Sequence, residues 1–332
     1  MAAEDTLLST QELSVVFDTP YGSVQALDHV NLTIRENEIV CLVGESGCGK
    51  STLGLSLIGL LPMPPARIAS GKIIHKGLDL TELNKGELRL MRGTEFFMIF
   101  QEPMSSLNPV LSIENQLLEA LRVRGQRLKV ETEASASGAY RELVRSLEMV
   151  KVPDPDRVLK GYPHQLSGGM RQRIMIAMAL LLKPSLLIAD EPTTALDVST
   201  QDQILKLFTE LVGGELKTSV LFITHDLTLV KTFAKRIAVM YAGEVVEDGP
   251  VEEVLSDPKH PYTQGLLKCL PRKRKLDGAI ESIPGSVPDL ANPPSGCKFN
   301  PRCKFVMEKC SRSRPDLFSV ATEHSARCFL YE

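Results

Sequence analysis

The sequence predicts an α/β protein whose core is an open, mainly parallel sheet with crossover helices. Two observations carry this prediction. Short apolar runs rich in Val, Ile and Phe alternate with stretches of helical periodicity, and several runs are apolar throughout, as expected of strands covered on both faces. In addition, the glycine-rich segment GESGCGKS directly follows one of these runs, where a strand would end and a helix begin.

The candidate strands are short and rich in β-branched and aromatic residues. We predict them at residues 30–34, 38–44, 72–77, 96–101, 185–191, 219–226 and 236–246. The strand signal disappears between about residues 111 and 183, where segments such as 140–150 repeat apolar residues at helical spacing. We therefore expect a helical subdomain there, with residues 122–138 as a polar loop inside it.

The composition changes after about residue 269. A basic run, PRKRK at 271–275, precedes a connector rich in Pro, Gly and Ser and a tail that holds four of the seven cysteines. We predict a main domain over residues 1–268 and a small Cys-rich domain over 269–332. The basic run is interpreted as a solvated linker in preference to a contact with anionic lipid or nucleic acid.

Charge and hydropathy exclude several classes of protein. A net charge of -3 and an isoelectric point near 6.1 give no reason to expect a nucleic-acid partner. The first ten residues are polar and acidic, so no signal peptide is expected. The longest apolar run, at 174–182, is shorter than the roughly 20 residues of a spanning helix. Without an export signal, a disulfide framework is not expected either.

The segment GESGCGKS has the spacing of a loop that wraps around phosphate. Glycines let backbone N–H groups converge on phosphate oxygens, and a helix expected from about residue 50 to 61 points its N-terminal dipole at the same anion. Lys50 would supply a positive charge to the β- and γ-phosphates of ATP, and Ser51 a hydroxyl for Mg²⁺. The predicted nucleotide-binding residues here are Gly44, Glu45, Ser46, Gly47, Cys48, Gly49, Lys50, Ser51 and Thr52.

A second signal is LLIADEP at residues 186–192. Its apolar residues predict a strand through the core, and two acids follow at the strand's end. Asp190 is placed to hold Mg²⁺ through water, and Glu191 to polarise an attacking water as a general base. A solvated sheet edge is the alternative, but the apolar strand ahead of the acids argues against it.

A third signal is LSGGMRQR at residues 166–173, which opens an apolar helix. Ser167 is predicted to cap this helix, while Gly168 and Gly169 leave N–H groups bare at a second positive helix end. This segment lacks the lysine of the first loop. By itself it would also fit a flexible loop that merely caps a helix.

Two polar residues at strand ends complete the set. Gln101 follows FFMIF and could sense Mg²⁺, as a ligand, or the attacking water. His225 follows SVLFIT and could contact the γ-phosphate or hold Glu191 in position. Either residue alone would more often be a structural hydrogen-bonding group.

Together these segments resemble the ATPase subunit of an ABC transporter, a match that covers about residues 7–262. It rests on LSGGMRQR, on LLIADEPTTALD and on the histidine of ITHD; Met170 stands where many members have Gln. The resemblance implies that two subunits pair head to tail, with ATP between residues 44–51 of one chain and the LSGG segment of the other. Tyr21 lies where these proteins stack an aromatic ring on adenine, and Phe17 is a less suitable substitute.

Within the superfamily, HPYTQGLLKCLP at 260–271, GCKFNPRC at 296–303 and MIFQEPMSSLNPVLSI at 98–113 resemble the dipeptide and oligopeptide permease ATPases. The resemblance implies a peptide importer at the cytoplasmic face of the cell membrane. Its partners would be two transmembrane permease subunits, a related ATPase subunit forming a heterodimer and, indirectly, an extracytoplasmic peptide-binding protein. Residues 102–113 would receive a coupling helix of the permease.

A soluble ABC ATPase acting on DNA or ribosomes is the alternative function. Translation-type members normally fuse two ATPase halves, whereas this chain has one. Repair-type members carry zinc modules inside the ATPase, and the sequence contains no such insertion. No nucleic-acid partner is therefore expected.

The C-terminal cysteines have the spacing C-x5-C-x6-C-x17-C, which differs from the C-x-x-C pairing usual in zinc sites. Four thiolates can ligate an iron–sulfur cluster, and the resemblance implies a 4Fe–4S cluster here, with zinc second and a metal-free cysteine group third. The predicted ligands are Cys297, Cys303, Cys310 and Cys328. Cys41 and Cys269 are predicted to be core residues, and Cys48 to face the nucleotide pocket.

Overall fold

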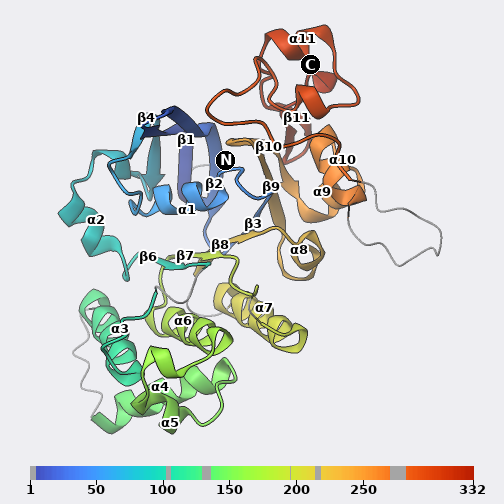
Figure 1. Cartoon of the computed structure of the whole chain (residues 1–332). Helices are drawn as coiled ribbons and strands as arrows, with labels where there is room; N and C mark the ends of the chain where they lie inside the picture. The colour runs from blue at the N-terminus through green and yellow to red at the C-terminus, as the bar shows by residue number, and fades with distance from the viewer. Residues whose placement is uncertain (1–4, 102–105, 129–135, 195, 214–217, 270–281) are drawn as a thin grey trace. The chain divides into compact units, whose positions relative to one another are not determined.

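The computed structural model describes residues 5–101, 106–128, 136–194, 196–213, 218–269 and 282–332 (Figure 1). The chain divides into two compact units. The first unit comprises Met1–Ile34, Ile39–Glu82 and Ile223–Glu332, and the second comprises Arg35–Glu38 and Leu83–Phe222. The domain boundary at residue 269 stays a prediction.

An antiparallel sheet of four strands forms one part of the first unit. Its order is β2-β1-β4-β5, and its long strands β1 and β4 pair with Leu8 opposite His75 and Phe17 opposite Ala66. The strands are β1 (Thr6–Thr19), β2 (Gly22–Arg35), β4 (Ala66–His75) and β5 (Leu78–Asp79). The sequence patterns identified β2 and β4 but not β1.

The first unit also contains a mixed row of strands in the order β11-β12-β10-β9-β3. They are β3 (Ile39–Val43), β9 (Arg236–Tyr241), β10 (Glu244–Pro250), β11 (Phe318–Ala321) and β12 (His324–Ala326). β3 and β9 are parallel, and the remaining pairs are antiparallel. Every residue of β3 is buried, as its apolar run predicts.

The prediction of one strand over residues 236–246 is wrong, because this segment is a hairpin. Ala242 and Gly243 have φ values of 47° and 83°, and two successive left-handed residues form the tight turn that antiparallel strands need. The apolar residues on both sides of the turn belong to β9 and β10. The apolar pair Val245-Val246 follows the turn so closely that, in the sequence, it continues the apolar run of β9.

The helices of the first unit are short. They are α1 (Lys50–Leu57), α8 (Leu227–Phe233), α9 (Val251–Ser256), α10 (Pro261–Lys268) and α11 (Glu308–Arg312). α1 begins at Lys50, as predicted, but ends well before residue 61. Its end precedes Gly59, whose φ of 62° is incompatible with a continuing α-helix.

The second unit contains three strands in the order β8-β7-β6 and the longer helices. The strands are β6 (Phe96–Ile99), β7 (Leu186–Asp190) and β8 (Ser219–Thr224), whose last two residues belong to the first unit. The helices are α2 (Lys85–Met91), α3 (Ile113–Leu128), α4 (Ala136–Met149), α5 (Pro155–Lys160), α6 (Gly168–Leu182) and α7 (Val198–Gly213). β6 and β7 are parallel, and β7 is wholly buried.

Helices α3 to α6 occupy the segment from which the strand signal is missing, drawn in green in Figure 1. The prediction of a loop over residues 122–138 is wrong for its two ends, since α3 continues to Leu128 and α4 starts at Ala136. The guanidinium of Arg124 on α3 donates to Glu142 of α4 and to the carbonyl of Leu181 on α6, so a charged residue here packs helices together. Residues 129–135 lie outside the described residues.

The C-terminal segment is anchored to the sheets of the first unit by pairing and by buried ion pairs. β12 pairs with β10, and Lys298 Nζ lies 2.8 Å from a carboxylate oxygen of Asp28. Arg314 Nε donates to Glu244 at 2.6 Å. Among the helices that the structure describes, none is long and apolar enough to cross a membrane.

Candidate nucleotide site

The loop at residues 44–49 is packed tightly against neighbouring backbone. It follows the buried strand β3, and its glycines stand where a side chain would not fit. A Cβ on Gly44 would lie 2.2 Å from the carbonyl oxygen of Met240, and one on Gly49 would lie 2.6 Å from that of Ala26. Gly49 also has a φ of 102°. The loop therefore requires glycine for both space and backbone conformation.

Lys50 lies inside this loop and is only 7% exposed. Its Nζ donates to the carbonyl oxygens of Gly44 at 2.8 Å and Glu45 at 2.9 Å. The positive charge is thus already at the centre of the loop, where a phosphate oxygen would meet it. Ser51 and Thr52 lie half-buried on the first turn of α1, and Ser46 and Gly47 are exposed at the tip.

Cys48 does not face a nucleotide pocket with its side chain, so that prediction is wrong. The residue is fully buried, and its thiol lies 3.7 Å from Lys50 Nζ, beneath the loop. Burial raises the pKa of this thiol, and the lysine opposes the rise only in part. Cys48 can contact phosphate only through its backbone N–H group.

The two acids predicted at the end of β7 lie in the second unit. Asp190 is 5% exposed, and Glu191 follows it with a φ of 48°, a backbone conformation that is uncommon outside glycine. Gln101 Nε2 donates to Glu191 Oε2 at 3.2 Å. The structure therefore brings together the predicted general base and the predicted sensor of Mg²⁺ or water.

The Ser167 segment begins α6, and its open surface differs from that of the first loop. The Ser167 hydroxyl accepts a hydrogen bond from the backbone N–H of Met170 at 3.3 Å, which is the predicted cap. A Cβ on Gly168 would meet no atom within 4 Å. The positive end of this 15-residue helix thus points toward open space.

The remaining predicted residues are accessible. Tyr21, in the turn between β1 and β2, is 99% exposed, whereas Phe17 is half-buried. His225 is exposed directly after β8. Tyr21, the residues 44–52 and His225 belong to the first unit, while Gln101, Asp190, Glu191 and the Ser167 segment belong to the second. The functional roles of all these residues stay predictions.

Comparison with known proteins decides what kind of nucleotide site this is. The family model described as ABC transporter matches residues 27–194. The dipeptide transport ATP-binding protein DppD of Bacillus subtilis is 45% identical over 328 residues, which is 99% of this chain and 96% of that protein. The chain belongs to the ABC transporter family. The predicted ABC ATPase fold is thereby confirmed.

Further comparisons place this ABC protein in the peptide-transport group. A model described as the C-terminal region of oligopeptide and dipeptide transporters matches residues 246–310. The oligopeptide transport ATP-binding protein OppD of Bacillus subtilis is 44% identical, with 98% of this chain and 88% of that protein covered. A solved dimeric structure of the ATP-binding cassette MJ0796, bound to ADP and phosphate, is 29% identical, with a TM-score of 0.64 over 74% of this chain and 98% of that one.

The four C-terminal cysteines of this ABC protein line one small cavity of about 10 Å³, together with Phe299, Phe305 and Phe329. Backbone N–H groups donate to two of the sulfurs, from Phe305 to Cys303 and from Met307 to Cys310, each at 3.4 Å. Burial raises the pKa of Cys297 to about 12. Within the described part of the chain, no three His, Cys, Asp or Glu side chains are grouped to hold a metal ion. The grouping of these side chains therefore supports neither zinc nor the predicted 4Fe–4S cluster.

The other cysteine predictions have mixed outcomes. Cys41 is completely buried in β3, which confirms its interpretation as a core residue. Cys269 is only half-buried, at the C-terminal end of α10, so its interpretation as a core residue is wrong. The residue ends an amphipathic helix and does not lie on its buried side.

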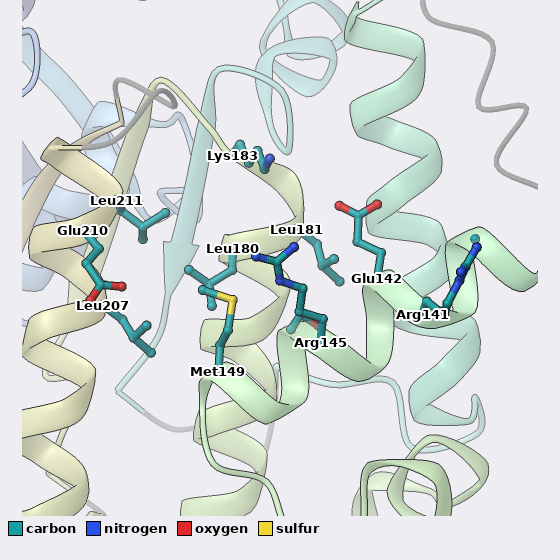
Figure 2. Close-up of a pocket in the computed structure, with 12 residues that line it drawn as sticks. Arg141, Glu142, Arg145, Met149, Leu180, Leu181, Lys183, Leu207, Glu210 and Leu211 are labelled. Carbon is teal, nitrogen blue, oxygen red and sulfur yellow. The ribbon is translucent and has the colours of Figure 1, made fainter.

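Sequence reasoning missed two features of the ABC protein. Arg302, two residues after Asn300, forms an ion pair with Glu45 of the nucleotide loop. A pocket of about 540 Å³ also lies between α4, the end of α6 and α7 in the second unit (Figure 2). An arginine inside the segment GCKFNPRC was a signal for the first feature. The second depends on three helices and has no local signature.

Proposed function

We propose that this chain is the ATP-hydrolysing subunit of an importer that takes up dipeptides or oligopeptides through a membrane permease. The observation that carries the proposal is that one chain combines the full set of nucleotide motifs with the C-terminal region of oligopeptide and dipeptide transporters. Relatives named for dipeptide and oligopeptide transport align with almost the whole chain. They give no support to the alternative, an ATPase that acts on DNA or ribosomes.

In the proposed reaction, residues of the first unit bind the triphosphate. Lys50 exchanges its two carbonyl acceptors for phosphate oxygens, and the N–H groups of residues 47–52 surround the β-phosphate. Tyr21 is free to stack on adenine because its ring is fully exposed. Exposed His225 would contact the γ-phosphate.

The residues of the second unit supply the hydrolytic chemistry. Glu191 accepts a proton from the attacking water, and the amide of Gln101 orients this carboxylate from 3.2 Å. Oxygen donors fit Mg²⁺: Gln101 of this unit and Ser51 of the first unit would ligate the ion and Asp190 would hold it through water, and the ion would neutralise developing charge on the phosphates. Preorganised charge of this kind is generally the largest part of catalysis in phosphoryl transfer.

A second ATPase chain would complete each nucleotide site. The Ser167 segment opens a 15-residue helix but has no lysine, so in this proposal it binds the γ-phosphate when another chain supplies the loop with Lys50. The similar cassette MJ0796 is described as dimeric. We propose a related ATPase subunit as the partner, in a head-to-tail heterodimer.

The pocket in Figure 2 is suited to dock the permease. Its lining combines four buried leucines (Leu180, Leu181, Leu207 and Leu211) with exposed Met149 and the basic residues Arg141, Arg145 and Lys183. Of the two acids in the lining, Glu142 is already paired with Arg124. The pocket therefore fits a short helix with apolar residues on one face and acids beside them. Of the predicted docking segment 102–113, residues 102–105 lie outside the described residues.

We propose that the chain works at the cytoplasmic face of the cell membrane, held there by two transmembrane permease subunits. A peptide-binding protein on the other side would act on it only through the permease. The basic run at 271–275, interpreted as a linker, lies outside the described residues.

The test is ATP-dependent peptide uptake by membrane vesicles that contain the chain. Co-purification with hydrophobic permease subunits and peptide uptake are expected for the wild type. Glu191→Gln should keep ATP affinity but lower turnover and uptake about 10²- to 10⁴-fold, because it removes the general base. Recovery of the chain on ribosomes or DNA alone would refute the transport function, and undiminished hydrolysis by the variant would refute the role of Glu191.

We also propose that Cys297, Cys303, Cys310 and Cys328 hold a 4Fe–4S cluster. The proposal rests on the four cysteines lining one cavity and on two of their sulfurs accepting backbone hydrogen bonds, although the four sulfurs are not grouped as a metal site in this structure. When bound, such a cluster would cross-link a segment with little core of its own. Cys303→Ser should lower the iron content and visible absorbance of anaerobically purified chain, while Cys269→Ser, outside the cavity, should not. Equal iron content in both variants would exclude the cluster.

A further inference from the structure

One arginine of the C-terminal segment (residues 282–332) forms an ion pair with the nucleotide loop (residues 44–49). Arg302 Nη1 donates to Glu45 Oε2 at 2.8 Å, and Nη2 donates to Glu45 Oε1 at 3.1 Å. The Arg302 side chain is 4% exposed and that of Glu45 is 28% exposed. Two parallel hydrogen bonds between a guanidinium and a carboxylate fix direction as well as distance. A single carboxylate of the loop is therefore held by a residue 257 positions away.

Arg302 is held independently of Glu45. Its Nε donates to the carbonyl of Pro284 at 3.0 Å, and its guanidinium carbon lies 5.8 Å from the centre of the Tyr241 ring. The Tyr241 hydroxyl accepts a further bond at 3.4 Å. These contacts hold the guanidinium in place without any contribution from Glu45, so Arg302 can fix the position of the Glu45 carboxylate.

Every polar group of Glu45 has a partner. Its N–H donates to the hydroxyl of Tyr262 on α10 at 2.9 Å, its carbonyl accepts from Lys50, and its carboxylate binds Arg302. Two of these three partners come from the part of the chain after residue 260. The third is the lysine that is expected to bind the phosphates. Glu45 thus connects the C-terminal part of the chain directly to Lys50.

The negative charge of Glu45 would affect nucleotide binding. Glu45 is the one acid among residues 44–52, beside the place where a triphosphate would add three to four negative charges. An unpaired carboxylate there would repel the nucleotide and be free to attract Lys50. Arg302 neutralises this carboxylate and directs it away from the lysine's amine.

We propose that Arg302 is a positioning residue for ATP, and that through it the C-terminal segment sets the affinity of the nucleotide loop. The inference rests on the proposed ATPase function. Arg302 immediately precedes Cys303, and Phe299 packs on the rings of Tyr241 and Tyr262. The wall of the cysteine cavity and the support of the loop are therefore the same short stretch of chain.

The experiment is a double-mutant cycle on the full chain, with binding of ATP, ADP and AMP measured by a fluorescent nucleotide. Arg302→Gln should weaken ATP binding about tenfold, because it leaves Glu45 unpaired beside the phosphates. Glu45→Gln alters the loop itself and is not expected to equal wild type, but the double variant should bind ATP more tightly than Arg302→Gln, because the unpaired carboxylate is gone. The loss should grow from AMP to ATP and shrink at high salt, since it is electrostatic.

A matched control and three outcomes make the result decisive. Arg312→Gln removes the same charge from an arginine that is 71% exposed and pairs with Glu308 in the described part of the chain, and it should bind ATP like wild type. Unchanged affinity in Arg302→Gln, or losses that merely add in the double variant, would overturn the inference while leaving the ATPase function intact. A wild-type chain that binds no ATP would overturn both.

If Arg302→Gln does not fold, the double variant and Arg302→Lys still test whether Arg302 acts on ATP binding through Glu45. Lysine keeps the charge but not the two parallel hydrogen bonds, so an intermediate affinity is expected. Wild-type affinity in Arg302→Lys together with weak binding in the folded double variant would show that Glu45 itself contacts nucleotide, and would overturn the inference.

Discussion

The chain has two glycine-rich helix starts, and they are built in opposite ways. Residues 44–49 are enclosed, with backbone carbonyls of Met240 and Ala26 pressed against two glycines and Lys50 folded inside. The Ser167 segment is open at Gly168, and Ser167 caps its helix by accepting a hydrogen bond from the N–H of Met170. The first segment is fixed by packing at Gly44 and Gly49, whereas the second leaves open space at Gly168.

This difference explains why one chain would carry two such elements. A loop that must hold a nucleotide by itself needs a fixed shape, so distant parts of the unit support it, including Tyr262 and Arg302. A surface that must meet and leave the γ-phosphate during each cycle needs access instead. The comparison therefore favours a site assembled from two chains over two independent sites in one.

Adding one methyl group to each segment gives the strongest test of the difference between residues 44–49 and the Ser167 segment. Gly44→Ala would force a Cβ to 2.2 Å from a backbone oxygen, and we expect it to lower the free energy of unfolding by roughly 3 to 5 kcal/mol and to abolish ATP binding. Gly168→Ala meets open space and should leave stability within about 1 kcal/mol of wild type. Urea unfolding with and without ATP measures both effects.

The same pair of variants separates folding from assembly. Gly168→Ala should bind ATP normally but hydrolyse it more slowly, because the added methyl group stands where the partner's nucleotide would approach. If instead both variants lost stability equally, the Ser167 segment would be as enclosed as the first loop. The comparison would then be wrong.

Much of the fold could be predicted because its signals are local. β3, β7 and β8 are short apolar runs that end in glycines, acids or a histidine, and each is wholly buried. β1 escaped because its alternation is interrupted at Glu12, which has a φ of 48° and lies where the pairing with β4 changes register. The hairpin of β9 and β10 escaped because Val245 and Val246 follow the turn closely and continue the apolar run of β9.

In the candidate site, the sequence predicted individual residues but not the contacts between residues far apart in the chain. Motif spacing identified Lys50, Glu191 and Ser167, since a strand end or a helix start places each of them. The bond between Gln101 and Glu191 joins residues 90 positions apart, and that between Arg302 and Glu45 joins residues 257 positions apart. No local pattern encodes such pairs, because folding alone brings them together. Cys48 was misjudged because its spacing shows that it belongs to the loop but not that its side chain turns inward.

Smaller effects on the free energy of unfolding are expected for variants of Ser167. Ser167→Ala should cost about 1 kcal/mol of unfolding free energy, because the N–H of Met170 loses its cap. Ser167→Asp keeps a capping oxygen and adds a negative charge at the positive helix end, so its stability should equal or slightly exceed that of wild type. Both variants should bind ATP with unchanged affinity, since the nucleotide loop is untouched.

Hydrolysis tells the two variants apart. If the open helix end exists to receive the γ-phosphate of a partner chain, the carboxylate of Ser167→Asp must repel that phosphate, and turnover should fall well below that of Ser167→Ala. If Ser167 only caps α6, turnover should follow stability, and the aspartate variant should be the more active one. The order of the two rates therefore decides whether this helix end is a binding surface. A binding surface makes the more stable variant, Ser167→Asp, the slower one, so a loss of stability cannot explain the result.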